Sequence, residues 1–230
     1  APVAAALCEC DADNLLVLLS ARRTAPAVRM LLERERRGFD ALIAPGHVAT
    51  VMGASEWRFV PESFSIPAAI AGFTPDTVLA AIRSVVRQVA DAAPRLDNCY
   101  RTVVRPEGNP GARRLLDETL RIVDASWRGI GAIPQSGFAL ADAHAHRDAR
   151  TIFADIAAGL DNAPRQMPAG CECAGVVLGE IRPTECPLYG KACTPRTPVG
   201  PCMVSDEGAC RIWWAAAGRG ASRPTNHAPA

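Results

Sequence analysis

The feature that most constrains this chain is the uneven distribution of its nine cysteines. Three are scattered through the first hundred residues, at Cys8, Cys10 and Cys99. The other six fall within forty residues near the C-terminus: Cys171, Cys173, Cys186, Cys193, Cys202 and Cys210. The segment around these six is rich in Pro and Gly and has little apolar periodicity, so apolar burial alone cannot fold it. Thiolate–metal bonds or disulfides must therefore hold it together.

The spacing of the six cysteines indicates which metal they bind. A long cysteine-poor stretch precedes them and the total is odd, which favours cytoplasmic metal or redox chemistry over a secreted disulfide framework. The pattern C-x-C-x12-C-x6-C-x8-C-x7-C contains no C-x2–4-C pair of the kind that zinc sites use. Iron–sulfur clusters accept wider spacings because their thiolates reach different irons. The spacing favours an iron–sulfur cluster, and the alternative is a zinc-stabilised protein-binding module without a redox role.

Charge and hydropathy narrow the class of partner. The chain has 25 Lys and Arg against 24 Asp and Glu, a formal net charge of +1. Nucleic-acid and anionic-membrane binders have a clear basic excess, so neither partner is expected. No apolar run approaches the ~18–20 residues of a membrane span. The composition, at 49% hydrophobic residues, predicts a globular protein with protein partners.

Upstream of the cysteines, short apolar runs alternate with helical periodicity. This alternation predicts an α/β fold, with a parallel or mixed sheet and flanking helices, plus a C-terminal cysteine-rich iron–sulfur module. The expected strands are 15–19, 41–44, 68–71, 99–104 and 129–133, and the expected helices are 24–32, 75–92 and 115–123. We expect residues 1–165 to form the α/β portion, 166–215 the module, and 216–230 a disordered tail. A polar, Pro-containing linker is expected at 161–170.

Three loop residues of the α/β portion are candidates for function. His47 follows a predicted strand, at the carboxyl end where open α/β sheets bind ligands. Glu107 and Asn109 lie in a Pro- and Gly-containing turn, and a plain turn is the alternative because Gly and Asn favour the left-handed backbone. His144 and His146 could suggest a metal site, but a solvated helix explains an i, i+2 pair more simply.

The cysteine segment resembles a known family. The run CECAGVVLGEIRPTECPLYGKACTPRTPVGPCMVSDEGAC (171–210) resembles the C-terminal region of HypD, a [NiFe]-hydrogenase maturation protein. Upstream segments resemble the same family, in the family's order. These are FDALIAPGHVATVMG (39–53), IPAAIAGFTPDTVLAAI (66–82), RPEGNPGA (105–112) and WRGIGAIPQSGF (127–138). The resemblance covers about residues 1–214.

The resemblance implies a cytoplasmic iron–sulfur maturation factor. Family members support assembly of the Fe(CN)2CO unit with the partners HypC and HypE, as a scaffold with thiol–disulfide redox activity rather than an ordinary enzyme. The family's [4Fe-4S] ligands follow C-x14-C-x6-C-x16-C, which selects Cys171, Cys186, Cys193 and Cys210 here, with Cys173 as the alternative to Cys171. Cys202 and Cys173 would then be a candidate redox pair beside the cluster.

This sequence also departs from the family pattern. The family's N-terminal iron-binding Cys and His motifs have no counterpart here, and Arg22 or Arg23 stands where relatives have a His. We therefore expect an N-terminally truncated chain that retains the electron-supplying portion. An inactive fragment lacking the iron-holding domain is a further alternative.

Overall fold

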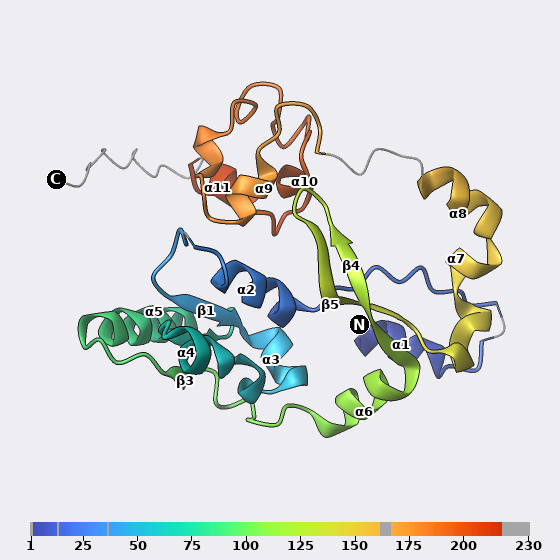
Figure 1. Ribbon diagram of the computed structural model, residues 1–230, viewed down its shortest axis with the longest axis horizontal. Helices are drawn as coiled ribbons and strands as arrows, with labels where there is room; N and C mark the ends of the chain where they lie inside the picture. The colour runs from blue at the N-terminus through green and yellow to red at the C-terminus, as the bar shows by residue number, and fades with distance from the viewer. Residues whose placement is uncertain (1, 13, 36, 162–166, 218–230) are drawn as a thin grey trace. The chain divides into compact units, whose positions relative to one another are not determined.

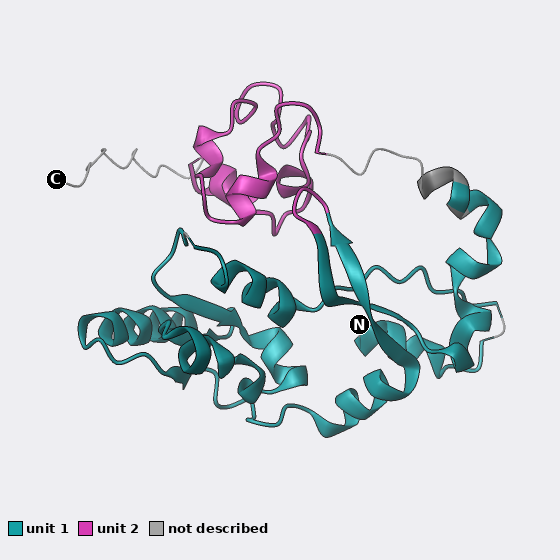
Figure 2. Cartoon of the chain, in the orientation of Figure 1, with its two compact units in different colours: residues 1–127, 132–163 teal, residues 128–131, 164–230 magenta. Residues whose placement is uncertain are grey.

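The computed structural model describes residues 2–12, 14–35, 37–161 and 167–217. The chain forms two compact units (Figure 2). The first unit comprises Ala1–Trp127 and Ala132–Ala163, and the second comprises Arg128–Gly131 and Pro164–Ala230. In the described ranges, no helix is both long and apolar enough to cross a membrane.

A three-stranded parallel sheet of order β1-β2-β3 organises the first unit (Figure 1). Its strands are β1 (Leu42–Pro45), β2 (Ala68–Ala71) and β3 (Leu96–Asn98). All four residues of β2 are buried, as expected for a central parallel strand covered on both faces. The predicted α/β class with a parallel sheet and flanking helices is confirmed. The helices of this unit are α1 (Pro2–Cys8), α2 (Thr24–Leu32), α3 (Gly46–Met52), η1 (Ala54–Trp57), α4 (Phe59–Phe64), α5 (Pro75–Ala90), α6 (Pro110–Thr119), η2 (Asp142–Arg147), α7 (Ala149–Ile152) and α8 (Ala154–Asp161).

Different helices cover the two faces of this sheet. On one face, Ile70 of β2 packs in a core with Trp57 of η1 and Val60 of α4, all of them fully buried. On the opposite face, Ala69 of β2 packs with Val85 of α5. Alternate strand residues point to opposite faces, so neighbouring residues of one strand contribute to both cores.

A buried glutamine ties α5 to the sheet. Gln88 donates a hydrogen bond from Nε2 to the carbonyl of Ala68 at 3.2 Å. Its Oε1 accepts one from the backbone N–H of Arg95 at 2.9 Å. The side chain thus satisfies its buried polar atoms while it fixes α5 against β2 and the start of β3.

A second sheet of two strands, β4 (Leu120–Trp127) and β5 (Gly131–Leu140), completes the first unit. Leu120 and Leu140 share a small core with Ala5 of α1 and Leu116 of α6. Asn109 caps α6, because its side-chain oxygen accepts a hydrogen bond from the N–H of Ala112 at 3.0 Å.

The second unit has little regular structure. Its helices are α9 (Cys173–Val177), η3 (Pro183–Glu185), α10 (Pro201–Val204) and α11 (Ala209–Ala217), which are joined by turns. Gly129 belongs to this unit, and its φ of +78° favours glycine. A Cβ at Gly129 would lie 2.8 Å from the Met167 side chain, so only glycine allows this close approach.

Four predicted elements differ from the structure. The strand expected at 129–133 begins two residues later, because residues 129 and 130 lie in a turn and β5 starts at Gly131. Residues 15–19 form no strand and make one isolated bridge, Val17 to Asp148. Residues 99–104 form a turn after β3, because the Asn98 side chain accepts from the N–H of Tyr100 and donates to the carbonyl of Val104, both at 2.9 Å. The predicted helix at 115–123 ends at Thr119, and the chain continues directly as β4.

The predicted linker and tail fall largely outside the described residues. Positions 162–166 of the linker and 218–230 of the tail are not described. Residues 216 and 217, which were expected in the tail, are the last two residues of α11.

Candidate functional site

Five of the six clustered cysteines share one core of the second unit: Cys171, Cys173, Cys193, Cys202 and Cys210. Cys186 is buried as well and acts on the ionisation of Cys171 and Cys210. Of the six, Cys171 alone is partly exposed, and none forms a disulfide. The core also includes Val176, Met203, Leu188 and Tyr189. Cysteines that are far apart in the sequence are therefore neighbours in a largely apolar environment.

Hydrogen bonds join four of the thiols in a row. The Cys171 thiol contacts that of Cys173, which contacts that of Cys202, which in turn contacts that of Cys210. Cys186 and Cys193 are close enough to Cys210 to act on its ionisation. The sulfur of Cys202 also lies 4.0 Å from the carbonyl oxygen of Cys173.

The pKa is raised for three of these thiols, Cys171, Cys173 and Cys210, and lowered for Cys202. Burial raises the pKa of Cys171 to about 11. Burial and the neighbouring thiols raise the pKa of Cys210 to about 12. The hydrogen bond from the Cys173 thiol lowers the pKa of Cys202, and the same bond raises that of Cys173. Cys202 is thus the thiol of this pair that ionises first.

The backbone at Gly200 lies so close to two of the thiols that no side chain fits there. A Cβ added at Gly200 would clash with the Cys171 sulfur and would lie 2.6 Å from the Cys173 sulfur. The preceding residue, Val199, donates its backbone N–H to the Cys193 sulfur at 3.4 Å. Hydrogen bonds to sulfur are among the interactions that set the chemical properties of thiolate ligands.

Aromatic side chains cover part of this core. Tyr189 and Trp214 pack edge to face with ring centroids 5.7 Å apart, and both rest on the cysteine core. Trp213, its sequence neighbour, is 39% exposed. Within the described ranges, no group of three or more His, Cys, Asp or Glu side chains is placed to hold a single metal ion.

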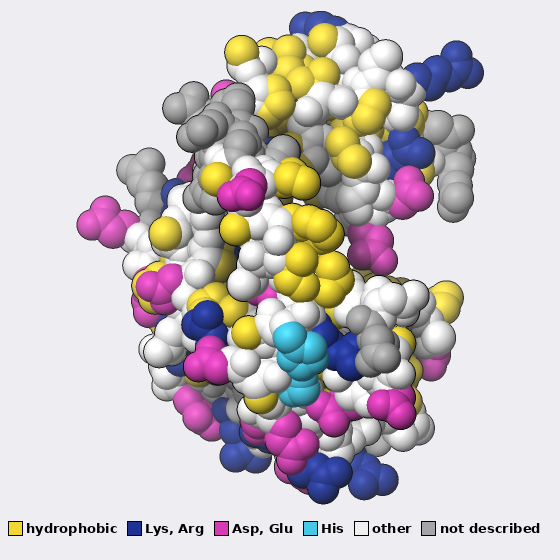
Figure 3. Space-filling model, turned by 90° about the vertical axis from the view of Figure 1, so that its right-hand side faces the viewer, with side chains coloured by type: hydrophobic (Ala, Val, Ile, Leu, Met, Phe, Trp, Pro, Cys, Tyr) yellow, Lys and Arg dark blue, Asp and Glu magenta, His cyan; other side chains and the backbone are white. Residues whose placement is uncertain are grey.

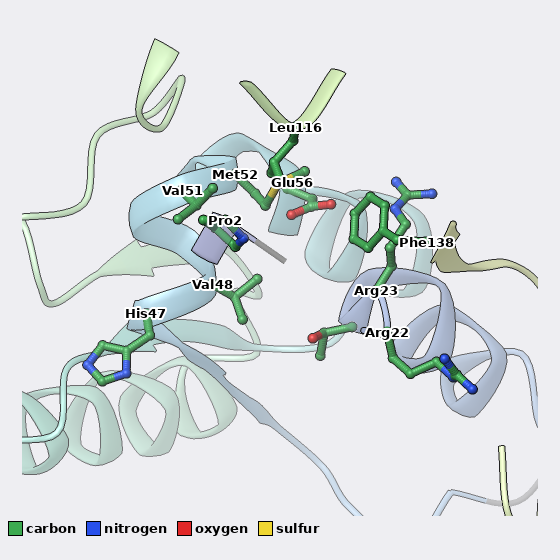
Figure 4. Close-up of a pocket in the computed structure, with 11 residues that line it drawn as sticks. Pro2, Arg22, Arg23, His47, Val48, Val51, Met52, Glu56, Leu116 and Phe138 are labelled. Carbon is green, nitrogen blue, oxygen red and sulfur yellow. The ribbon is translucent and has the colours of Figure 1, made fainter. Parts of the chain in front are cut away.

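A separate pocket of about 260 Å³ lies in the first unit (Figure 4). Apolar side chains of α3, α6 and β5 line most of it, including Val48, Met52, Leu116 and Phe138. Its charged lining residues are Arg22, Arg23, His47 and Glu56. In Figure 4, His47 and Arg22 stand at opposite ends of the group, and the Glu56 carboxyl lies between Met52 and Phe138.

Glu56 is the half-buried ionisable group of this pocket. Its burial raises the pKa of the carboxyl, and the guanidinium groups of Arg23 and Arg113 offset part of that rise. Arg23 donates to the carbonyl of Gln135 at 2.9 Å, and Arg22 donates to that of Ser20 at 3.2 Å. The guanidinium groups are thus held by backbone carbonyls, and the pocket remains mainly apolar.

The three predicted loop residues occupy different positions. His47 lies in the first turn of α3, directly after β1, and its ring is 4.3 Å from that of Phe73. Asn109 has the capping role described above. Glu107 is exposed, and its carbonyl accepts a hydrogen bond from Arg113 at 3.0 Å. His47 lines the pocket, whereas Glu107 and Asn109 do not.

His144 and His146 lie on the 3-10 helix η2. Figure 3 shows one face of the molecule, on which histidine side chains lie beside basic and acidic ones. The ring centroids of His144 and His146 are 6.5 Å apart. His144 makes a contact of 3.5 Å with the carboxylate of Glu9, the residue after α1, and His146 is exposed. His144 therefore helps to attach η2 to the segment that follows α1.

Comparison with known proteins identifies the family. A family model described as HypD, Hydrogenase formation hypA family, matches residues 1–217. The chain belongs to the HypD family. The resemblance predicted from the cysteine run and the four upstream segments is confirmed.

Several curated HypD proteins are similar over most of this chain. Hydrogenase maturation factor HypD of Escherichia coli K12 is 34% identical over 205 residues, 89% of this chain and 54% of that protein. HypD2 of Bradyrhizobium diazoefficiens is 35% identical over 209 residues, 88% of this chain and 54% of that protein. HypD1 of the same organism is 40% identical over 178 residues, 76% of this chain and 45% of that protein. The chain spans about half the length of these relatives.

Two residues of interest were missed by reasoning from the sequence of this HypD-family chain. Gly200 directly precedes Pro201-Cys202. A glycine beside a Pro-Cys pair is the sequence signal that could have indicated close packing against a cysteine. Glu56 carries no signal in the sequence, because its burial depends on α3, α6 and β5 meeting around it.

Proposed function

We propose that this chain carries a [4Fe-4S] cluster and a redox-active thiol pair, and that it relays electrons during hydrogenase maturation. The observation that supports this proposal is the convergence of five thiols in one core, with Cys186 close enough to act on the ionisation of Cys171 and Cys210. Family membership supports the hydrogenase maturation role.

Cys171, Cys186, Cys193 and Cys210 would hold the cluster. Cys171 and Cys186 both act on the ionisation of Cys210, and Cys186 also acts on that of Cys171, so these sulfurs share one region. A bound cluster would supply one-electron transfer. The Val199 N–H would tune it, and the Tyr189–Trp214 pair would shield it.

Cys173 and Cys202 would act as the redox pair. Their thiols are in direct contact, and the lowered pKa of Cys202 makes it the better nucleophile. Oxidation of the pair forms one S–S bond and releases two electrons and two protons, and reduction reverses this. This assignment leaves Cys171, rather than Cys173, as the first cluster ligand.

The iron carrying CN and CO ligands would be the cargo, held with HypC-like and HypE-like partners outside the residues described. The resemblance to the family implies both the cargo and the partners. Cytoplasmic location is part of the same proposal, because free thiols and a cluster persist in a reducing compartment.

Anaerobic reconstitution with iron and sulfide tests the cluster. We expect a brown protein with absorbance near ~400 nm and about four irons per chain. Each of the variants Cys171→Ser, Cys186→Ser, Cys193→Ser and Cys210→Ser should lose this absorbance and the bound iron. The control Cys99→Ser should keep both. A colourless protein with about one zinc per chain would support the zinc-module alternative instead.

Counting alkylated thiols tests the redox pair. After mild oxidation of the reconstituted protein, we expect two fewer reactive thiols in the wild type than after reduction. Cys202→Ser should lose this difference and keep its iron. If Cys202→Ser loses iron while Cys171→Ser keeps it, the assignment of ligands is wrong.

A further inference from the structure

Helix α5 carries a second apolar row that no described part of its own unit covers. The buried face of this helix packs on the sheet through Ala81, Val85 and Gln88. Beside that face, four aliphatic side chains are 65%, 43%, 60% and 49% exposed: Leu79, Ile82, Val86 and Val89. We call these four the α5 stripe. Their spacing of 3, 4 and 3 residues is that of a helix–helix packing seam.

The polar contacts of α5 show which way the stripe faces. Ser84 donates a hydrogen bond to Asp97 of β3 at 2.6 Å, and Gln88 also reaches Asp97. This flank of α5 is therefore turned toward β3. At 100° per residue, the α5 stripe lies on the opposite flank of the helix, which faces β1.

The edge strand β1 continues the same apolar surface. Leu42 and Ala44 pack in the core that contains Trp57, so Ile43 between them points to the face of the sheet on which α5 lies. Ile43 is 40% exposed. Strands are about 4.8 Å apart and packed helices 8–10 Å apart, so a helix laid beside α5 would cover Ile43. Helix α5 lies against β1 and β2 (Figure 1), so the exposed side chains of the α5 stripe and Ile43 form one apolar surface at the corner between α5 and β1.

The charged residues around the α5 stripe indicate what kind of partner this surface could bind. Arg83 and Arg87 are exposed on the solvent side of the α5 stripe, and neither side chain forms a hydrogen bond or ion pair with any described residue. Asp76 and Asp91 lie at the two ends of the helix, beyond the stripe. The middle of this surface is therefore apolar with a positive border on its solvent side, and Asp40 lies at the end near Val89.

We propose that the corner between α5 and β1 binds an amphipathic helix of another protein. Its aliphatic face would cover the α5 stripe and Ile43, and acidic residues along one border would pair with Arg83 and Arg87. A second copy of this chain fits less well, because antiparallel pairing of two stripes centres near Ser84 and brings the two Arg83 side chains together. This surface is independent of the cysteine core.

The test uses two synthetic helical peptides of about 20 residues, long enough to form a helix. Both carry Leu at seam positions, one with Glu and the other with Lys along the border. Fluorescence anisotropy with the full chain should show the Glu peptide binding about threefold to tenfold more tightly, as two exposed ion pairs predict. Val86→Gln should weaken the binding of both peptides by at least about tenfold, because it removes an aliphatic contact that becomes buried when the peptide binds. Arg83→Glu with Arg87→Glu should invert the preference.

Two controls make the result specific. Leu18→Gln changes another exposed aliphatic residue, 68% exposed, and should leave binding unchanged. Circular dichroism and the thermal midpoint should show that Val86→Gln folds normally, since residue 86 is exposed and Gln favours helices.

Four results would overturn the proposal. These are no binding of either peptide, binding that ignores Val86→Gln, and a preference that does not invert. The fourth is a wild-type chain that self-associates or binds phosphatidylserine-containing vesicles, with a Val86→Gln variant that does not. Lost self-association would assign the surface to a second copy of the chain, and lost vesicle binding would assign it to a membrane.

Discussion

Replacing Gly200 by alanine tests the packing of the thiol core most directly. The backbone at Gly200, with φ −96° and ψ 154°, suits alanine, so the substitution strains no dihedral angle. The added Cβ would clash with the Cys171 sulfur and would lie 2.6 Å from that of Cys173, closer than ordinary contact by about 1 Å. Both thiols, or the backbone of α10, must move to make room.

The expected decrease in the free energy of unfolding follows from how far these atoms must move. Adding one methyl group to a well-packed core costs about 1–3 kcal/mol, and here two buried sulfurs must shift together. We expect Gly200→Ala to lower the free energy of unfolding of the second unit by this amount. The assay is urea unfolding in the presence of a reductant, followed by the fluorescence of Trp213 and Trp214 against the background of the other tryptophans.

A matched control separates thiol displacement from general stiffening of the chain. Gly175 lies in α9 of the same unit, and a Cβ there would meet only the Ile181 and Glu180 side chains, at 3.3 Å or more. Gly175→Ala should therefore be close to neutral. Equal stabilities of Gly200→Ala and wild type, together with equal thiol reactivity at Cys171 and Cys173, would show that the packing argument is wrong.

Three further predictions concern the first unit. Asn109→Ala should destabilise it by about 1 kcal/mol through loss of the α6 cap, whereas Asn109→Asp should not; equal thermal midpoints for both variants would refute the capping role. Gln88→Leu should cost about 1–3 kcal/mol in urea unfolding, because it leaves the Arg95 N–H without its partner and removes the side-chain bond to the Ala68 carbonyl, and a neutral result would contradict this. Folding raises the pKa of Glu56, so the folded state holds more protons than the unfolded state between the two pKa values, and stability falls as pH rises through that window. Glu56→Gln should therefore gain stability relative to wild type from about pH 4 upward, and a pH-independent difference would show that Glu56 is not perturbed.

Several features of the fold could be predicted because they are local. Thr74-Pro75-Asp76 and the helical spacing after it predict a helix, and the structure has α5 at Pro75–Ala90. The short apolar runs before Pro45 and Gly72 are β1 and β2. Such signals are read from a few neighbouring residues, so no knowledge of distant parts of the chain is needed.

Other features could not be predicted because distant contacts decide them. The run Leu15–Leu19 has strand composition, yet no strand lies alongside it to form a ladder, and only Val17 makes a bridge. Leu120 and Val123 keep helical spacing with Leu116, but they pair with β5 instead. Strand formation depends on a partner, so periodicity alone gives the wrong element there.

The sequence by itself determined the family of this chain and the capacity of its C-terminal segment for thiolate chemistry. Cysteine number, spacing and the adjoining prolines are covalent facts that no folding alters. Only the tertiary structure decided that Cys202 meets Cys173, that Gly200 leaves room for two sulfurs, and that Arg83 and Arg87 border an uncovered apolar row. The physical reason is that acidity, packing and exposure depend on distances between atoms, and those distances are set by segments far apart in the chain.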